Sequence, residues 1–461
     1  MLSSGDDLIK IVVVGCGKIG TAIIESLVSE GHDVIAVDNN QSVVSEMVEL
    51  YDCMGVCGSG TDCDTLMECG MQDCELFISV TGFDEFNMLS CFLAKRMGAA
   101  HTIARIRNPE YNDKNSGFMR EQLGLSLAIN PELLAAAEAF NVLRLPSAVK
   151  IETFSRRSVE MIELKLKENS ALDGMSLIEM RKEFKANFLI CAVSRGEEVF
   201  IPDGNFVLKS GDRIGVTAAP YEIEKLLKKL GLMQKKARNV MILGASRTAY
   251  YLARMLLRAG STVKIIDPSH ERCTQFCEEL PDDAVIIEGD TTKQEILLEE
   301  GIGSMDAMAA LTGIDEENIL LSLFASSQNV PKVVSKIDRD EFGALAENIG
   351  IESIVSPRNI IADVLVRYAR GLENSMGSKM ETLYKIMEGK AEALEFRIRA
   401  DSPIIGKPLK DVKLKKNILI AGISRGRRPI IPSGDDCINV GDMVIVIAAG
   451  HRINDITDII K

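Results

Sequence analysis

Gly15-Cys16-Gly17-Lys18-Ile19-Gly20 follows the apolar run Ile11 to Val14 and opens a segment, Ile19 to Val28, whose apolar residues recur at helical spacing. A GxGxxG motif at the turn between a buried strand and a helix is typical of a dinucleotide-binding Rossmann domain. In such a turn Gly15 allows the tight bend, Gly17 lets the backbone approach a pyrophosphate, and Gly20 lets the helix pack closely on the sheet. The free N–H groups at the start of the helix then face the phosphates.

An acidic residue, Asp38, ends the next apolar run, Val34 to Val37. A carboxylate at this position accepts both hydroxyls of an adenosine ribose and repels a 2′-phosphate, so it favours NAD or NADH over NADP. The alternative is a solvated strand end, but the glycine motif favours the ribose role. Thr81 follows a further apolar strand, so we expect it at the same carboxyl edge of the sheet, where ligands of this fold bind.

The same pattern recurs in the second half of the chain at a nearly constant offset. Gly244-Ala245-Ser246-Arg247-Thr248-Ala249 follows Val240 to Leu243, Asp267 ends Val263 to Ile266, and Thr312 again follows an apolar strand. The matches indicate an internal duplication. The Cβ atom of Ser246 would crowd a pyrophosphate, whereas the acid Asp267 is retained, so the sequence leaves open whether the second site binds a nucleotide.

The segments after these two units repeat as well. Ser194-Arg195-Gly196 and Gly211-Asp212 return as Ser424-Arg425-Gly426 and Gly441-Asp442, among short β-rich runs and turn residues. The predicted fold class is therefore α/β, with two Rossmann-like domains of doubly wound parallel sheets, each followed by a small α+β domain. We place the four domains at residues 1–145, 158–232, 236–372 and 389–461, with linkers near Pro146 to Arg157 and Gly371 to Gly389.

A helix signal closes each Rossmann-like unit. Asn130-Pro131 and Ser356-Pro357 each combine an N-cap residue with a proline that suits the first helical turn. The second helix carries four apolar or aromatic residues on one face, Ile361, Val364, Leu365 and Tyr368. This face packs either on its own sheet or against another subunit, and the pattern does not distinguish the two.

Composition argues against several classes of function. The net charge of −14 and the pI near 5.0 do not suit nucleic acid binding, which needs a basic surface. No uncharged apolar run would span a bilayer, and the polar segment Met1 to Asp7 does not look like a signal peptide, so we expect a cytoplasmic location. The eleven Cys show no CxxC pair, and the chain has four His and no P-loop lysine motif. We therefore expect neither a metal site nor a catalytic site.

Five short motifs together resemble the RCK N domain, which is also called the TrkA N domain. They are Gly15 to Gly20, Asp38, Gly58 to Thr61, Thr81 to Asn87 and Ile103 to Pro109. The repeated Ser-Arg-Gly and Gly-Asp segments resemble the RCK C domain. The N–C–N–C order over nearly the whole chain is similar to that of the TrkA family, the cytosolic subunits of bacterial Trk potassium uptake systems.

The resemblance implies a regulatory subunit rather than an enzyme. Such subunits bind NAD or NADH, and related members bind ATP or ADP. They form a ring beneath a membrane potassium-translocating subunit, and nucleotide binding changes the ring and gates transport. Four chains with two units each would make a homotetramer with an eight-domain ring, peripheral at the inner face of the plasma membrane. The alternatives are an NAD-dependent oxidoreductase and a freestanding nucleotide sensor.

The resemblance also implies roles for individual residues. Gly15 to Ile19 would hold the phosphates, and Asp38 would hold the adenosine ribose. The adenine side would be lined by Ser59, Gly60 and Thr81, and Arg105 would contact the phosphates. The matching positions in the second unit are Gly244 to Thr248, Asp267, Asp290, Thr291, Thr312 and Lys336. Ser246 and Lys336 depart from the pattern of the first unit.

Overall fold

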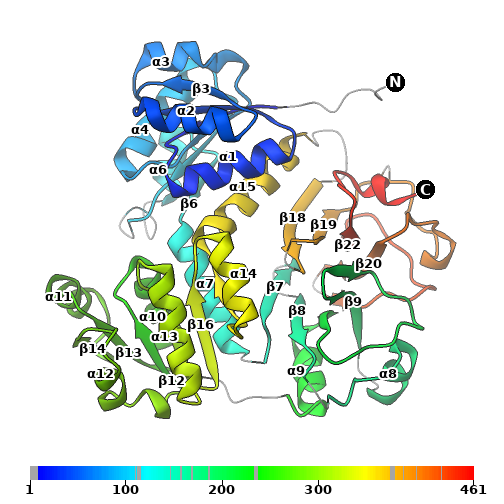
Figure 1. The fold of residues 1–461 in the computed structure, drawn as a ribbon. Helices are drawn as coiled ribbons and strands as arrows, with labels where there is room; N and C mark the ends of the chain where they lie inside the picture. The colour runs from blue at the N-terminus through cyan, green and yellow to red at the C-terminus, as the bar shows by residue number, and fades with distance from the viewer. Residues whose placement is uncertain are drawn as a thin grey trace.

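Each half of the chain begins with the strand, glycine turn and helix that the sequence predicts. Figure 1 shows the computed structural model of the chain. The residues it describes are 9–108, 111, 116–145, 147–155, 158–167, 170–184, 187–232, 237–373, 379–387, 389–400, 402–426 and 428–461. The predictions about Met1 to Asp7 and the end of the motif at Pro109 lie outside these residues.

The first unit is a parallel sheet of six strands in the order β3-β2-β1-β4-β5-β6. Val14 pairs with Val37 and Ser79 on the neighbouring strands, so Asp38 and Thr81 follow at one carboxyl edge. The strands are β1 (Lys10–Val14), β2 (Asp33–Asp38), β3 (Met54–Cys57), β4 (Leu76–Ser79), β5 (His101–Arg105) and β6 (Leu127–Ile129). The helices are α1 (Lys18–Ser29), α2 (Gln41–Leu50), α3 (Cys63–Glu68), α4 (Asp84–Met97), α6 (Ser116–Leu123) and α7 (Pro131–Arg144).

The second Rossmann unit repeats this topology with the order β14-β13-β12-β15-β16-β17. Its strands are β12 (Asn239–Leu243), β13 (Thr262–Asp267), β14 (Ala284–Glu288), β15 (Ala307–Ala310), β16 (Lys332–Lys336) and β17 (Ile354–Val355). Its helices are α10 (Arg247–Arg258), α11 (His270–Glu279), α12 (Gln294–Glu299), α13 (Asp315–Ser327), α14 (Asp340–Asn348) and α15 (Pro357–Glu373). The duplication therefore extends to every strand of the sheet.

A five-stranded antiparallel sheet follows each Rossmann unit. The first contains β7 (Lys150–Phe154), β8 (Val159–Lys165), β9 (Phe188–Arg195), β10 (Glu198–Phe200) and β11 (Arg213–Ala218), with helices α8 (Leu177–Phe184) and α9 (Pro220–Lys229). The second contains β18 (Lys379–Ile386), β19 (Ala391–Arg397), β20 (Ile418–Arg425), β21 (Arg428–Ile430) and β22 (Met443–Ala449). The predicted fold class is confirmed.

None of the helices in the described ranges has the length and apolar character that a membrane-spanning segment needs.

The repeated Ser-Arg-Gly and Gly-Asp segments meet in these sheets. Arg195 donates two hydrogen bonds of 2.7 Å to Asp212, and Arg425 makes the same contacts with Asp442 at 3.0 and 2.9 Å. Both carboxylates are buried. An arginine fork suits such a carboxylate, because two parallel N–H groups reach both oxygens. The sequence repeat therefore reflects an ion pair in each small domain between a buried carboxylate and a partly exposed arginine.

The two segments predicted as linkers hold strands instead. β7 pairs with β8, and β18 pairs with β19, so each antiparallel sheet begins before residues 158 and 389. The linker prediction is wrong at these strands. The parts of the predicted linkers at 146, 156–157, 374–378 and 388 lie outside the described residues.

The last helix of each Rossmann unit, α7 or α15, packs into the core of the other unit. Ala135, Ala136 and Ala139 of α7 pack into the core of the second unit, together with α10. Ile361 and Leu365 of α15 pack into the core of the first unit, against α1. Figure 1 shows α15 lying along α1, and α7 lying beside α10. This face of α15 therefore packs on the first unit of the same chain, which is neither of the two partners that the sequence left open, its own sheet and another subunit.

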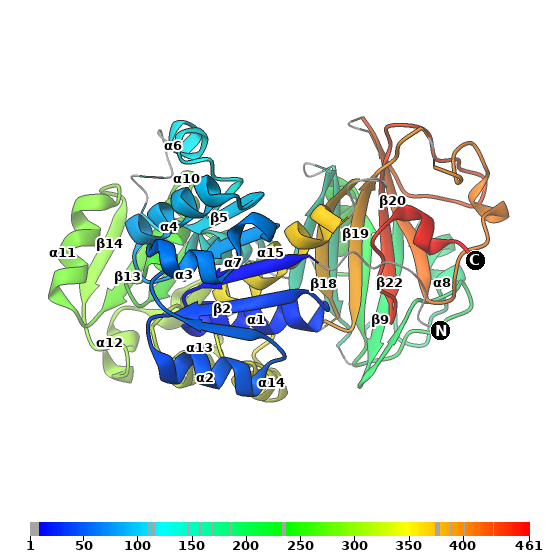
Figure 2. The same cartoon turned by 90° about the horizontal axis from the view of Figure 1, so that it is seen from above.

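The two antiparallel sheets also pack face to face, on one side of the Rossmann pair (Figure 2). Their shared core joins Phe154 and Cys191 of the first sheet to Ile386 and Ile445 of the second. The hydroxyl of Thr217 donates a 2.9 Å hydrogen bond across this interface to the carbonyl of Ala421. Each small domain therefore buries one face of its sheet against the sheet of the other small domain.

Arg370, near the end of α15, joins three parts of the molecule. Its guanidinium makes hydrogen bonds of 2.7 and 2.8 Å to Glu30, which caps α1, and of 2.9 and 2.8 Å to Glu392 on β19. The Arg370 side chain is only 2% exposed. Burial on its own would raise the pKa of Glu30, but the hydrogen bond and charge of Arg370 outweigh it and hold that pKa below its ordinary value.

Replacing Arg370 by Met should destabilise the chain by about 3 kcal/mol, because two partly buried carboxylates lose a buried guanidinium and, among the described residues, only Glu30 keeps another cation, Arg452 at 3.6 Å. Urea unfolding measures the change, and Arg258→Met, at an exposed position on α10, is the matched control. In the wild type the Glu30 contribution is present above about pH 4.3, the ordinary value for glutamate, and is lost as the pH falls through the lowered pKa. Equal unfolding midpoints for the two variants at pH 7 would contradict this assignment.

Candidate functional site

The glycine turn between β1 and α1 has little room for side chains at two of its positions. Gly15 has φ +95°, and a Cβ atom there would lie 3.0 Å from the backbone nitrogen of Thr81. A Cβ on Gly20 would lie 1.8 Å from the carbonyl oxygen of Gly15. Gly17, in contrast, has φ −72° and open space where its Cβ would be. Gly17 is the N-cap of α1 and provides no side-chain cap, so the helix N-terminus is open at this point.

The carboxylate of Asp38 faces this turn. Its Oδ2 accepts a 2.9 Å hydrogen bond from the backbone N–H of Cys16, and its Oδ1 accepts a 3.0 Å bond from that of Asn40. Among the described residues these two backbone groups are its hydrogen-bond donors, and Asp38 also lines a cavity. Its charge is therefore left available to hydroxyl groups of a ligand.

Cys16 contributes its backbone but not its thiol. The side chain is 4% exposed, and it packs in the core of the first unit. Burial, with a contribution from the Asp38 carboxylate, raises the pKa of the thiol to about 12. The thiol is therefore neutral and does not act as a nucleophile near pH 7.

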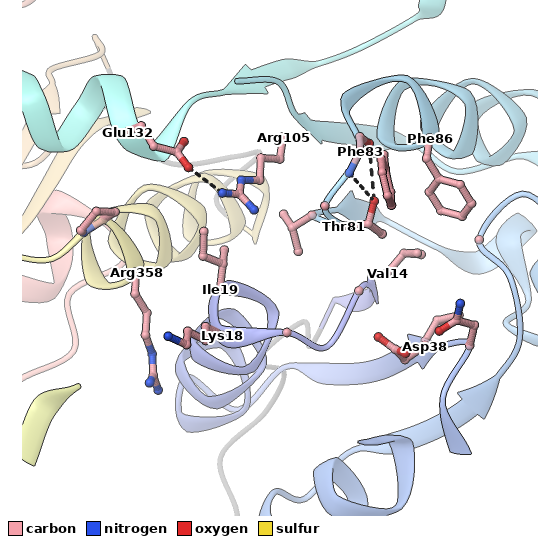
Figure 3. Close-up of a pocket in the computed structure, with 18 of the residues that line it drawn as sticks. Val14, Lys18, Ile19, Asp38, Thr81, Phe83, Phe86, Arg105, Glu132 and Arg358 are labelled. Atoms are coloured by element: carbon pink, nitrogen blue, oxygen red, sulfur yellow. Dashed lines mark hydrogen bonds and ion pairs between the residues drawn. The ribbon is translucent and has the colours of Figure 1, made fainter. Parts of the chain in front are cut away.

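A cavity of about 660 Å³ lies over the turn (Figure 3). Nine of the residues predicted for the first unit line it: Gly15, Gly17, Lys18, Ile19, Asp38, Ser59, Gly60, Thr81 and Arg105. Cys16 and Gly20 do not line it, because they support the turn from behind. Phe83 and Phe86 add an aromatic wall beside Thr81, as Figure 3 shows.

Asn87 holds the edge of this cavity in place, and sequence reasoning assigned it no role. Its Oδ1 accepts hydrogen bonds from the backbone N–H and the hydroxyl of Thr81, at 2.8 and 2.7 Å. Its Nδ2 donates a 3.0 Å bond to the carbonyl of Arg105. Asn318 makes the same bonds to Thr312 and Lys336 in the second unit. The repeat of Asn in both Thr-to-Asn motifs was the signal that could have identified it.

The end of the cavity away from Asp38 is charged and is built by both Rossmann units. Lys18 and an ion pair of 2.7 Å between Arg105 and Glu132 come from the first unit. Five residues of the second unit complete it: Thr248, Lys336, Asp338, Pro357 and Arg358. Figure 3 shows Arg358 close to Lys18, and the Arg105–Glu132 pair on the opposite side of the cavity from Asp38. Lys336, predicted to serve the second unit, thus lines the cavity of the first.

Three buried polar atoms in this region have no hydrogen-bond partner among the residues that the structure describes. They are Nε of Arg105, Oε2 of Glu132 and Nε of Arg358. Burial lowers the pKa of Arg105, although the neighbouring Glu132 opposes the shift. Buried polar groups in proteins almost always have partners, so unpartnered ones in residues that line a cavity favour a ligand-binding role for that cavity. The residues present therefore fit a ligand that carries both acceptors and donors at this end.

The second unit keeps the frame of the first. Gly244 has φ +96°, and Oδ2 of Asp267 accepts a 2.7 Å hydrogen bond from the backbone N–H of Ala245. Asp290 accepts hydrogen bonds from the backbone and hydroxyl of Thr292, so it closes the turn before α12. These residues and Ser246 lie at the carboxyl edge of the second sheet, and they do not line the cavity described above.

The family models match both halves of the chain in the order that the folds repeat. The TrkA-N domain model matches residues 11–131 and 240–357, and the TrkA-C domain model matches residues 161–231 and 393–461. The chain belongs to the TrkA family. The resemblance seen in the sequence is thereby confirmed.

Relatives of this TrkA family chain match it over all or nearly all of their length. It is 34% identical to the Trk system potassium uptake protein TrkA homolog of Archaeoglobus fulgidus, over 98% of this chain and 100% of the relative. It is 28% identical to the Trk system potassium uptake protein TrkA of Vibrio alginolyticus, over 96% of both. Among solved structures, the GsuK RCK domain covers 97% of this chain and 94% of its own, with a TM-score of 0.64 and 17% identity, so the fold is shared.

Gly15→Ala should destabilise the chain by about 1–3 kcal/mol, because alanine is strained at positive φ. The Cβ would also meet the backbone of Thr81. Gly17→Ala is the matched control, since its φ is ordinary and its Cβ meets no atom, and we expect its stability to equal that of the wild type. Thermal unfolding measures both changes. A Gly17→Ala variant less stable than Gly15→Ala would show that the turn differs from the one described.

Proposed function

We propose that this chain is a nucleotide-binding regulatory subunit that gates a potassium uptake transporter. The observation that supports this best is the cavity between the two Rossmann units, in which buried atoms of Arg105, Glu132 and Arg358 lack partners. The relatives are named as potassium uptake proteins of Trk systems, which identifies the transport process. The partner in this proposal is the membrane potassium-translocating subunit of such a system.

We infer that the ligand is NAD or NADH. Asp38 would accept the hydroxyls of the adenosine ribose, and the open helix N-terminus at Gly17 would take the pyrophosphate. The adenine side would be formed by Ser59, Gly60 and Thr81, which line the same cavity. A solved structure of this fold is a GsuK channel bound to NAD, with a TM-score of 0.63 and 18% identity.

The charged end of the cavity favours a dinucleotide over ATP or ADP, which are the alternative ligands. The unpartnered Nε atoms of Arg105 and Arg358 need acceptors, which phosphate or ribose oxygens of any of these nucleotides would supply. The unpartnered Oε2 of Glu132 needs a donor. The second ribose and the carboxamide of NAD carry donors, whereas the terminal phosphates of ATP repel a carboxylate.

Ligand binding in this cavity would act on the arrangement of the two units, because both of them line it. α15 begins beside the cavity at Pro357 and Arg358, and near its end Arg370 pairs with Glu392 of the second antiparallel sheet. One helix thus connects the site to the paired small domains. Coupling of about 1–3 kcal/mol per site is typical of allosteric proteins. Several sites in one ring would approach the roughly 5.5 kcal/mol that moves an equilibrium from 1:99 to 99:1.

The proposal assigns the nucleotide a regulatory role and not a role in a reaction. An NAD-dependent oxidoreductase is the alternative from another class, and it requires a hydride donor or acceptor besides the nucleotide. Oxidation of NADH by the purified chain with candidate carbonyl substrates would support that alternative. The relatives are named for potassium uptake, which favours a role in transport over the oxidoreductase alternative.

We propose that four chains join through α4 and α13 to form an eight-domain ring against the inner face of the plasma membrane. Leu89 on α4 and Leu320 on α13 are 48% and 67% exposed, and they occupy equivalent positions in the two units. Phe83 and Ile314, just before these helices, are 73% and 56% exposed. Apolar side chains exposed at the same place in both units favour a repeated contact between chains.

Asp38→Asn should weaken NADH binding about tenfold to a hundredfold, because hydrogen bonds from the ribose to a charged acceptor are lost. Isothermal titration calorimetry measures the change, with NAD, NADPH and ATP titrated in parallel. Asp33→Asn, at the exposed opposite end of the same strand, is the control and should bind as the wild type does. If the wild type binds none of these nucleotides, the proposed function is wrong.

The double variant Leu89→Asp/Leu320→Asp should convert the tetramer into smaller species, because it places charges in the proposed contacts. Light scattering coupled to size-exclusion chromatography measures the mass. Leu298→Asp is the matched control, because Leu298 on α12 is 51% exposed and lies away from the proposed contact helices. A tetramer that survives the double substitution would rule out this interface.

A further inference from the structure

The acid that would bind ribose in the second unit is already paired with a cation. Oδ1 of Asp267 accepts hydrogen bonds from Nε and Nη2 of Arg272 at 3.0 and 2.8 Å, and from the backbone N–H of Ser269 at 2.8 Å. With the bond from Ala245 to Oδ2, both oxygens are engaged, and Asp267 is 3% exposed. A ribose would have to displace the half-exposed Arg272 side chain from a carboxylate that is itself buried.

The first unit has no such pair at the equivalent place. Arg272 is the third residue of α11, and the third residue of α2 is Val43, which packs against the core of its own unit. Asp38 is therefore held by backbone N–H groups of Cys16 and Asn40, and it faces the cavity. The two carboxylates occupy the same position in the fold, but only the one in the first unit is available to a ligand.

The phosphate end of the second site is also occupied. The hydroxyl of Ser246 accepts a 3.3 Å hydrogen bond from the backbone N–H of Ala249 and caps α10. In the first unit Gly17 leaves the start of α1 uncapped by any side chain, with open space around the position of a Cβ atom. A side-chain oxygen thus takes one of the N–H groups that a pyrophosphate would use.

We propose that Arg272 and Ser246 close the nucleotide site of the second unit, so that each chain binds one dinucleotide, in the first unit. This inference rests on the proposed function. The second unit contributes Lys336 and Arg358 to the site of the first, where they face the equivalent residues Arg105 and Glu132. The residues at these two equivalent positions in both units therefore line one cavity, and all four would contact the same ligand.

Calorimetric titration of NADH into the full chain tests the proposal through the number of sites per chain. We expect one site in the wild type, one site of about tenfold to hundredfold weaker affinity in Asp38→Asn, and one site of unchanged affinity in Asp267→Asn. A chain with Arg272→Val and Ser246→Gly has the residues of the first unit at these two positions, and it should bind two NADH. Its thermal unfolding is compared with that of the wild type to confirm that it folds.

Two NADH per wild-type chain, with one of them lost in Asp267→Asn, would overturn the proposal. One site in the wild type that remains one in a folded Arg272→Val/Ser246→Gly chain would overturn the assignment to these two residues. If the double variant does not fold, the comparison of Asp38→Asn with Asp267→Asn still decides between the two sites. Absence of any NADH binding by the wild type refutes the proposed function itself, and it is thus distinguished from the other outcomes.

Discussion

The two Rossmann units bury each other's closing helix, and this hydrophobic exchange determines how everything else is placed. Small residues such as Ala135 and Ala139 let α7 approach the second unit closely, while Ile361 and Leu365 of α15 fill the core of the first. Neither sheet has a complete apolar cover without the other half of the chain, so the two units are held face to face. The start of α15 consequently reaches the carboxyl edge of the first sheet, where Arg358 joins the cavity.

Duplication gave the chain two copies of one frame, and small substitutions separate their chemistry. The bend at Gly15 and Gly244, the acid at Asp38 and Asp267, and the buried Asn that holds the edge are common to both units. The surroundings of the acid differ, because Val43 in one unit corresponds to Arg272 in the other. One side chain is thus enough to change a carboxylate from an available acceptor into a structural ion pair.

Much of the fold could be predicted from the sequence, because its signals are local. The glycine motif, Asp38 and the repeat predicted both parallel sheets, and the structure brings most of the predicted site residues around one cavity. Arg358 and the placement of Lys336 could not be predicted, since they depend on which unit α15 covers, and an apolar helix face does not identify its partner. β7 was mistaken for a linker because its buried face is completed by the other small domain, far away in the sequence.

The shared core of the two antiparallel sheets has a consequence for how the chain could be divided. Each half, produced as a separate polypeptide, would expose a sheet face and a closing helix whose complements lie on the other half, so the halves suit fragment complementation. Two identical halves would present similar surfaces to each other. Because the two halves are joined in one chain, each half always pairs with the other and not with a copy of itself. One half can therefore change its site residues while the other keeps the residues that bind the ligand.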